Sequence, residues 1–168
     1  MGTNTRDIMK KLLIIFAALA LVAGCTKPGT EDDPTANLVG KTWYSITGEK
    51  YTVEEFITVA GNKISTGTNT YNLINKMAFY SGGKGTNDVY YQKVIDVPSM
   101  TRVSQQYKSL GFAWEYKDGQ LTIDYDTADD ILPKQLRIKV NYIWTESFSG
   151  TLNGKEFGMY TDPKIVEK

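Results

Sequence analysis

The side chains that most often carry catalysis are scarce in this chain. Its 168 residues include no histidine and a single cysteine, Cys25. This composition excludes Ser-His-Asp and Cys-His catalysis, zinc sites with histidine ligands and the commonest general base. The chemistry that remains is that of paired carboxylates, which flank a scissile bond in glycosidases.

Two groups of acidic residues could provide such a pair. Glu54 and Glu55 are adjacent, so in a strand they point to opposite faces and cannot act together. The second group contains four residues, Asp124, Asp126, Asp129 and Asp130. Asp124 and Asp126 share a face of an expected strand, but it is the polar one. We therefore expect a solvated surface and no catalytic residues, with a carboxylate-based hydrolase as the only enzyme alternative.

The same aspartates offer oxygen ligands of the kind that Ca²⁺ prefers, but their run lacks the glycine and the distal glutamate of an EF-hand loop. They are a weak calcium candidate, and we expect no metal. Asp126-Thr127-Ala128 also fits an Asp-Ser/Thr-small or apolar acceptor pattern for bacterial O-glycosylation. Thr127 is therefore a candidate modification site.

Aromatic side chains are the remaining candidates for binding. Eleven tyrosines and three tryptophans could line a barrel mouth and stack on a sugar or a flat apolar ligand. Trp43, Trp114 and Trp144 are explained equally well as core residues. Four tyrosines beside expected loops are the candidate ligand-facing residues: Tyr80, Tyr90, Tyr91 and Tyr107.

The N-terminal segment has the pattern of an export signal. Lys10 and Lys11 precede an apolar run, Leu12–Leu19, that is too short to span a bilayer. The run is followed by Leu21-Val-Ala-Gly-Cys25, which resembles the bacterial lipobox. That resemblance implies a signal peptide over residues 1–24 and a diacylglycerol and an acyl chain such as palmitate on Cys25. Several acyl chains satisfy the need for more than one lipid signal in stable anchoring.

Residues 25–37 are predicted to form a flexible tether, because they contain proline, glycine and acidic residues and no regularly spaced apolar residues. Thr26 stands where an aspartate would favour retention in the inner membrane in the enterobacterial scheme, so we expect the outer membrane. Acidic residues soon after the cysteine resemble a surface-export signal. Periplasmic and cell-surface orientations both stay open.

The length remaining after the tether fits one domain with its own core. The chain carries 19 basic and 19 acidic residues, so it offers no excess positive charge to a phosphate backbone. We expect a monomer with no nucleic-acid partner.

Two hairpins give the clearest structural signal. Asp118-Gly119 and Asn153-Gly154 are typical two-residue type I′ turns. Pairing across the first turn gives one apolar face and one mostly polar face, with Tyr116 opposite Leu121, Trp114 opposite Ile123 and Phe112 opposite Tyr125. Pairing across the second turn sets Phe148 opposite Met159 and Phe157 over Gly150.

Further strands are expected from period-two alternation at Val39–Ile46, Tyr51–Val59, Lys76–Tyr80, Val89–Val97 and Leu136–Trp144. One short helix is expected over Ser99–Leu110, where Met100, Val103, Tyr107 and Leu110 recur at helical spacing behind a serine. The pattern predicts an all-β domain over residues 38–162, followed by a C-terminal tail over 163–168. An antiparallel up-and-down barrel is favoured because it leaves no free edges, and a two-sheet sandwich is the alternative.

Three motifs in order carry a family resemblance: Leu38-Val-Gly40-Lys-Thr-Trp43, Met77-Ala-Phe79-Tyr-Ser-Gly-Gly and Trp114-Glu-Tyr116-Lys-Asp-Gly-Gln-Leu-Thr-Ile123. Behind a lipobox and an acidic tether, this order resembles the small lipocalin-like lipoproteins of Bacteroidota over most of residues 38–160. The resemblance implies a lipocalin-like barrel that binds a small apolar or carbohydrate-like ligand. The alternative is a plugged barrel that docks a cell-envelope protein or inhibits an enzyme.

Overall fold

The computed structural model describes residues 33–96 and 101–167. The expected signal peptide, Cys25 and the first part of the tether lie outside the described residues. Residues from Pro34 onward form a compact unit with its own core.

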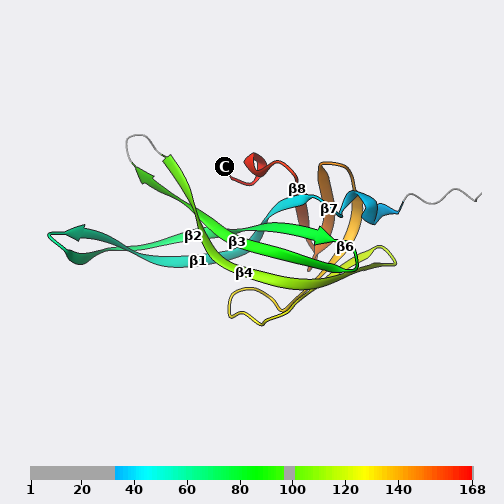
Figure 1. Ribbon diagram of the computed structural model, residues 1–168, viewed down its shortest axis with the longest axis horizontal. Coiled ribbons are helices and arrows are strands. Elements are labelled where there is room, and N and C mark those ends of the chain that lie inside the picture. Colours follow the sequence, from blue (N-terminus) through cyan, green and yellow to red (C-terminus); the bar gives the residue numbers. More distant parts are fainter. Residues whose placement is uncertain (1–32, 97–100, 168) are drawn as a thin grey trace, which may run out of the picture. The chain divides into compact units, whose positions relative to one another are not determined.

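This unit is an antiparallel barrel closed by eight strands in chain order (Figure 1). Consecutive strands pair, and β1 meets β8 where Tyr44 lies opposite Tyr160. The up-and-down barrel expected from the sequence is therefore confirmed, and the sandwich is excluded. The elements are η1 (Pro34–Asn37), β1 (Thr42–Val59), β2 (Asn62–Tyr80), β3 (Lys84–Asp96), β4 (Thr101–Lys117), β5 (Gln120–Tyr125), β6 (Gln135–Ile143), β7 (Ser147–Leu152), β8 (Lys155–Tyr160) and η2 (Pro163–Ile165).

Both predicted hairpins have the expected register. Asp118 and Gly119 have φ values of 51° and 76°, and Asn153 and Gly154 have 52° and 76°, as a type I′ turn requires. The pairs Tyr116–Leu121, Trp114–Ile123 and Phe112–Tyr125 form as predicted. So do Phe148–Met159 and Gly150–Phe157.

The helix expected over Ser99–Leu110 is wrong. Ser99 and Met100 lie outside the described residues, and the rest of the segment belongs to β4, paired with β3. The ladder matches Val89 with Lys108 and Tyr90 with Gln106, so Tyr107 is an extra residue in a bulge. The bulge moves one face of the sheet from odd residues of β4 such as Val103, which is exposed in the arm, to even ones such as Leu110, which is buried. This shift turns a period of two into spacings of four and three, which resemble a helix.

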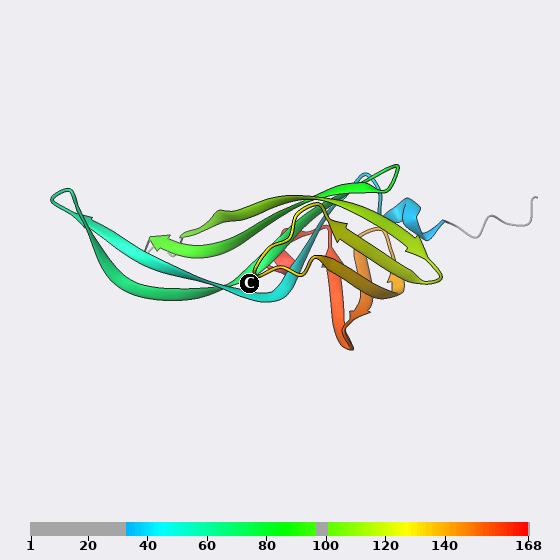
Figure 2. The ribbon, with the colours of Figure 1, turned by 90° about the horizontal axis from the view of Figure 1, so that it is seen from below.

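The first four strands are longer than the sequence pattern predicts. The β2–β3 ladder runs only from Ile74–Tyr90 to Tyr80–Lys84. Beyond it, β1 and β2 continue as a first arm (residues 47–73), and β3 and β4 continue as a second arm (residues 91–96 and 101–109). Figures 1 and 2 show both arms leaving the same end of the barrel.

A second bulge changes the expected orientation of β6. Val140 pairs with Gly150 and Tyr142 with Ser149, so Asn141 is the extra residue. Leu136 and Ile138 point into the core, as the alternation predicts, but after the bulge Ile143 is buried instead of Tyr142 and Trp144. The interpretation of Trp144 as a core residue is therefore wrong.

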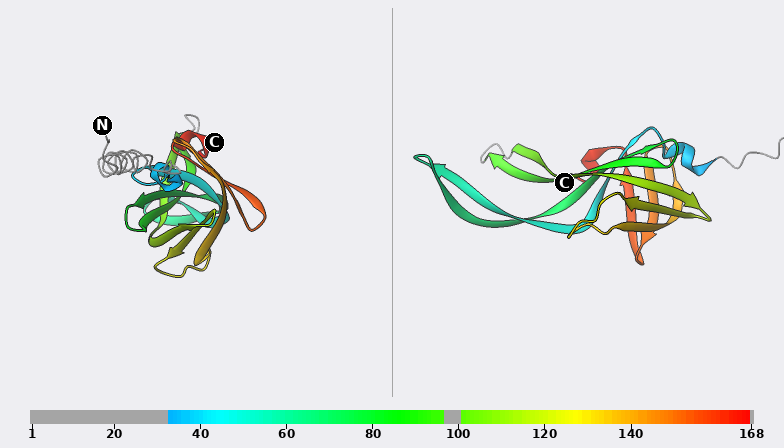
Figure 3. Two further views of the ribbon diagram at one scale, coloured as in Figure 1. Left: turned by 90° about the vertical axis from the view of Figure 1, so that its right-hand side faces the viewer. Right: turned by 60° about the horizontal axis from the view of Figure 1, so that its bottom comes forward.

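Large apolar side chains from all sides fill the narrow part of the barrel, which Figure 3 shows nearly end-on in its left view. Trp43 is fully buried and donates its indole N–H to the carbonyl of Leu38 at 2.9 Å. Side chains of this size each contribute about 1.5–3 kcal/mol when buried. The largest fully buried members are Trp43, Phe79, Phe112 and Phe148.

Both ends of the unit extend beyond the expected domain boundaries. Pro34–Asn37, assigned above to the tether, form η1, and the Asn37 amide donates to the carbonyl of Ile143 at 3.3 Å. Pro163–Ile165, assigned to the tail, form η2, and Val166 is buried beside Ile74 and Tyr90. Among the described residues, no helix has the length and apolar character needed to cross a membrane.

Candidate functional site

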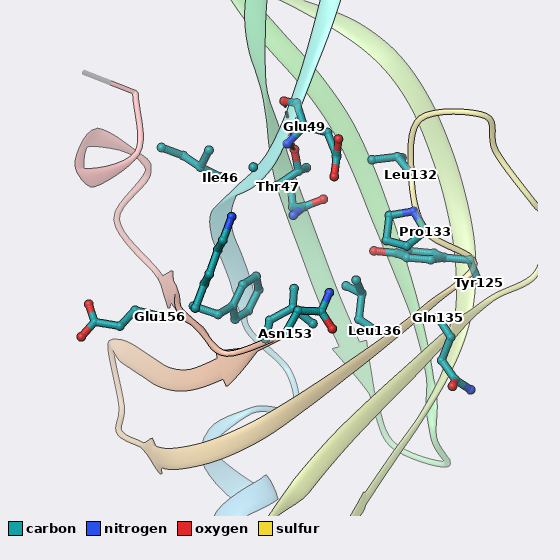
Figure 4. Close-up of a pocket in the computed structure, with 15 residues that line it drawn as sticks. Ile46, Thr47, Glu49, Tyr125, Leu132, Pro133, Gln135, Leu136, Asn153 and Glu156 are labelled. Carbon is teal, nitrogen blue, oxygen red and sulfur yellow. Dashed lines mark hydrogen bonds between the residues drawn. The ribbon is translucent and has the colours of Figure 1, made fainter.

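A pocket of about 450 Å³ opens where the first arm leaves the barrel (Figure 4). Its apolar surface comes mainly from Ile46, Leu132, Leu136, Leu152 and Phe157. Asn75 and Tyr125 add polar groups on the inside, while Glu49, Lys155 and Glu156 supply the charged side chains. The Glu156 side chain points away from the pocket in Figure 4. The lining therefore offers apolar contact and hydrogen bonding.

A wide bulge in β1 forms one wall of the pocket. Ile46 pairs with Ile74 and Lys50 with Asn72, so Thr47–Glu49 face a single residue of β2. Gly48 makes this possible with a φ of 83°, a conformation that glycine adopts at little cost. The hydroxyl of Thr47 accepts the Glu49 N–H at 2.8 Å and fixes the bulge.

The loop between β5 and β6 forms the opposite wall and is held by Asp129. Its carboxylate accepts the backbone N–H groups of Ile131 and Leu132, both at 2.9 Å, and the Lys108 ammonium at 2.7 Å. Burial opposes ionisation of Asp129. The hydrogen bonds from Lys108, Leu132, Ile131 and the Tyr107 hydroxyl outweigh that effect and lower its pKa to about 2.

The calcium candidate is not assembled. Asp124 accepts a hydrogen bond from the Gln135 amide, and Asp129 is used by the loop. In the part of the chain that the structure describes, no three acidic, histidine or cysteine side chains come close enough to hold an ion. Thr127 is exposed in the same loop, and its glycosylation stays a prediction.

Two of the four candidate tyrosines meet in a cluster between the arms, outside the pocket lining. Tyr91 lies 5.0 Å from Tyr71 and 5.5 Å from Tyr51, between ring centroids. Tyr107 lies 4.6 Å from Tyr51. These four residues, the tyrosine cluster, join the first arm to the second, so the rings of Tyr91 and Tyr107 pack against tyrosines of the first arm.

An ion pair also joins the two arms, next to the tyrosine cluster. The Lys93 ammonium lies 2.9 Å from the Glu55 carboxylate, which also accepts the Tyr71 hydroxyl at 3.1 Å. The Lys93 hydrogen bond lowers the pKa of Glu55, and burial is the main cause that raises the pKa values of Tyr71, Tyr91 and Tyr107. Glu54 is exposed on the other face, as expected of adjacent strand residues.

The other two candidate tyrosines lie elsewhere. Tyr80 is exposed at the end of β2, where its hydroxyl lies 3.1 Å from that of Thr86. Tyr90 points to the outer side of the barrel wall, packs with Ile74 and Val166, and donates to Glu167 at 2.7 Å. Its burial strongly raises the pKa of its hydroxyl.

The sequence reasoning missed the polar side chains that line the pocket. The predicted pairing with Phe112 puts Tyr125 on the apolar face of its hairpin and gives no sign of a binding role. Asn75 belongs to β2 and is buried. A polar residue at an inward position of a strand is the sequence feature that could have indicated its place in the site. Such a position can be recognised only once the register of β2 is known.

The fold and the site together define an eight-stranded antiparallel barrel with a partly apolar pocket at its arm end. Comparison of the chain with protein-family models, curated proteins and solved structures gives no match.

Proposed function

We propose that this protein is a lipoprotein, anchored to the outer membrane through Cys25, whose lipocalin-like barrel binds a small apolar or carbohydrate-like ligand. In this proposal it is a monomeric binding protein and not an enzyme; it uses no cofactor, and the covalent lipid on Cys25 is its membrane anchor. The supporting observation is the pocket, where apolar walls meet a few buried polar groups, the usual make-up of a small-molecule site.

Native mass spectrometry on the unit Pro34–Lys168, purified from an envelope extract of its own host, tests ligand binding. We expect a co-purifying molecule of defined mass. Leu152→Trp, which fills the pocket from β7, should abolish it. Thr151→Trp adds the same side chain on the other face of β7 and should retain it. A ligand-free mass for the wild-type unit would contradict the proposal.

The anchor has its own test. Cys25→Ser removes the thiol that would carry diacylglycerol, so we expect no incorporation of labelled palmitate and either a soluble protein or an uncleaved precursor. Normal maturation and partition of this variant with the outer membrane would refute the lipoprotein proposal. Protease treatment of intact cells then separates periplasmic from surface orientation.

The alternative function, docking to a cell-envelope protein, is favoured by the tip of the first arm. Phe56, Ile57, Val59 and Ile64 are each about half exposed there. Ile57, Val59 and Ile64 share one face, because Ile57 pairs with Ile64. A photo-crosslinker placed at the tip of the first arm in living cells should capture a specific envelope protein under this alternative. Under the first proposal it should give no specific adduct.

A further inference from the structure

A chain of hydrogen-bonded polar side chains crosses the barrel interior beside the pocket. The Asn75 amide donates to Ser45 at 3.0 Å, and the Asn87 amide donates to Asn75 at 2.8 Å and to the Tyr125 hydroxyl at 2.9 Å. All four side chains are buried, and Asn87 is 0% exposed. We call these residues the polar cluster.

The polar cluster is incompletely satisfied. The Asn87 side-chain carbonyl has no hydrogen-bond partner among the described residues. If the amides of Asn75 and Asn87 were both turned over, Ser45 and Tyr125 would become donors and the Asn87 amino group would be unpartnered instead. In either orientation one end of Asn87 lacks a partner, although native proteins rarely leave a buried polar group unpaired.

Two members of the polar cluster reach the pocket. Asn75 and Tyr125 belong to its lining, and the Tyr125 hydroxyl points toward its centre in Figure 4. Burial raises the pKa of Tyr125 to about 12, so the hydroxyl stays protonated at physiological pH. Asn87 lies behind both side chains and holds them in place.

The polar cluster contains no charged group. The charged pocket residues Glu49, Lys155 and Glu156 are exposed, whereas the cluster consists of two amides and two hydroxyls. A charge buried without a partner of opposite sign is strongly disfavoured. The inner end of the pocket is therefore suited to a neutral group that both donates and accepts hydrogen bonds.

We infer that the pocket takes an uncharged amphiphile, with a hydroxyl or carboxamide group bound by Tyr125 and Asn75 and its apolar part against Leu132, Leu136 and Phe157. This inference rests on the proposed ligand-binding function and names the chemical class of the ligand. It excludes an anionic head group from the inner end.

Three probes with the same apolar chain test the inference: decanamide, 1-decanol and decanoic acid, each titrated into the unit Pro34–Lys168 at pH 7.5. We expect the amide and the alcohol to bind at least 10-fold more tightly than the carboxylate. Tyr125→Phe keeps the ring and removes the hydroxyl, so it should weaken the two neutral probes about 10-fold and leave the acid unchanged. Tyr116→Phe, outside the pocket, is the matched control.

The outcomes separate the inference from the function on which it rests. If all three probes bind equally to the wild type, or the acid binds most tightly, the inference is overturned while ligand binding stands. If none binds, the inference is overturned, and the native mass spectrum of the wild-type unit decides whether ligand binding stands. The wild-type comparison does not depend on a variant, so a misfolded Tyr125→Phe protein would not affect the decision.

A separate observation concerns the opposite end of the barrel. Tyr142 and Trp144 are 37% and 62% exposed, and their rings stack with centroids 4.2 Å apart. The start of the described chain lies against the same segment, because Asn37 donates to Ile143 and Lys41 donates to the carbonyl of Thr145 at 2.8 Å. The turn between β6 and β7 accordingly lies beside η1 in Figure 1.

We propose that Tyr142 and Trp144 rest in the head-group region of the bilayer that holds the lipid anchor. Cys25 precedes Pro34 by nine residues, which span at most about 30 Å when extended, so the barrel end that bears η1 stays near the membrane. Tryptophan and tyrosine favour that region because their rings are apolar with one polar end. This proposal rests on the lipid anchor and not on the ligand.

The test uses the full lipidated chain in vesicles of phosphatidylethanolamine that contain brominated lipid, which quenches nearby tryptophans. Trp43 is buried and Trp114 is half-buried, so Trp144 should account for most of the quenching. Trp144→Phe should remove at least two thirds of it. Equal quenching in the wild type and the variant would overturn the proposal, and a chain that does not associate with the vesicles would overturn the anchor as well.

Discussion

At the scale of single residues, Asp129 determines the shape of one pocket wall. Its carboxylate accepts hydrogen bonds from two backbone N–H groups of its own loop and forms an ion pair with Lys108 on β4. A carboxylate in this position acts like a cap, because it satisfies backbone donors that would otherwise lack partners. The loop that carries Leu132 and Pro133 into the pocket thus depends on one ionised side chain.

Asp129→Asn should lower the free energy of unfolding by about 1–3 kcal/mol at pH 7, since charge-assisted hydrogen bonds are lost. The pKa of Asp129 is depressed to about 2 in the folded protein, so its contribution is complete above about pH 5 and is lost as the pH falls through about 2. Urea unfolding between pH 7 and pH 2 should show the variant and the wild type converging in acid. A difference that stays constant across this range would contradict the role of the charge.

At the scale of elements, the turn of the first arm has an unfavourable residue. Ala60 has a φ of 48° and Gly61 one of 80°, the geometry of a type I′ turn. A non-glycine residue without a short polar side chain is disfavoured in this left-handed region. Asn153, which occupies the corresponding position between β7 and β8 with a φ of 52°, is the residue type that this turn favours.

Ala60→Asn should therefore stabilise the first arm by about 1 kcal/mol. Because the arm extends beyond the barrel, the effect should appear as slower amide hydrogen exchange near the turn and not as a large rise in melting temperature. Asn153→Ala is the reciprocal control and should lower the melting temperature of the whole barrel. If amide hydrogen exchange in the first arm is the same in Ala60→Asn and the wild type, the turn does not have the type I′ conformation described here.

At the scale of the whole molecule, a closed barrel carries two projecting arms, and the outer part of the first arm lies outside its core. The side chains from Phe56 to Thr70 are all exposed, and among the described residues the tyrosine cluster and the Glu55–Lys93 ion pair join the two arms. Residues 56–70 bury little surface, so we expect this part of the arm to be dispensable for folding of the barrel. Arms of this length without a role in stability are consistent with a role in contact with other molecules.

Replacing residues 53–69 with Asn-Gly should shorten the first arm and preserve the barrel. Thr52 and Thr70 are paired, with their hydroxyl oxygens 2.9 Å apart, so a two-residue turn can connect them. We expect circular dichroism to give a melting temperature within about 5 °C of the wild type, because a loss of about 1 kcal/mol shifts the melting temperature by a few degrees. Ligand binding in the pocket should persist, whereas docking through the arm tip should be lost. Unfolding of the shortened protein would show that the arm supports the barrel.

The sequence alone determined the parts of this protein that depend on neighbours along the chain. The Asp118-Gly119 and Asn153-Gly154 turns fixed two hairpin registers, since turn type sets the pairing and alternation sets the faces. Lipidation of Cys25 is inferred in the same way from the residues next to it in the chain, and it stays a prediction. The succession of hairpins favoured a barrel over a sandwich, but closure depends on the pairing of Tyr44 with Tyr160, which lie far apart in the chain.

Only the tertiary structure decided what depends on irregular backbone and on distant segments. Single extra residues at Tyr107 and Asn141 reverse which side chains face inward, and a pattern of period two cannot reveal them in advance. They account for the wrong helix and for the exposure of Trp144. The pocket unites the bulge of β1, the loop after β5 and the turn after β7, so its polar residues Asn75 and Tyr125 became recognisable only when barrel closure brought these segments together.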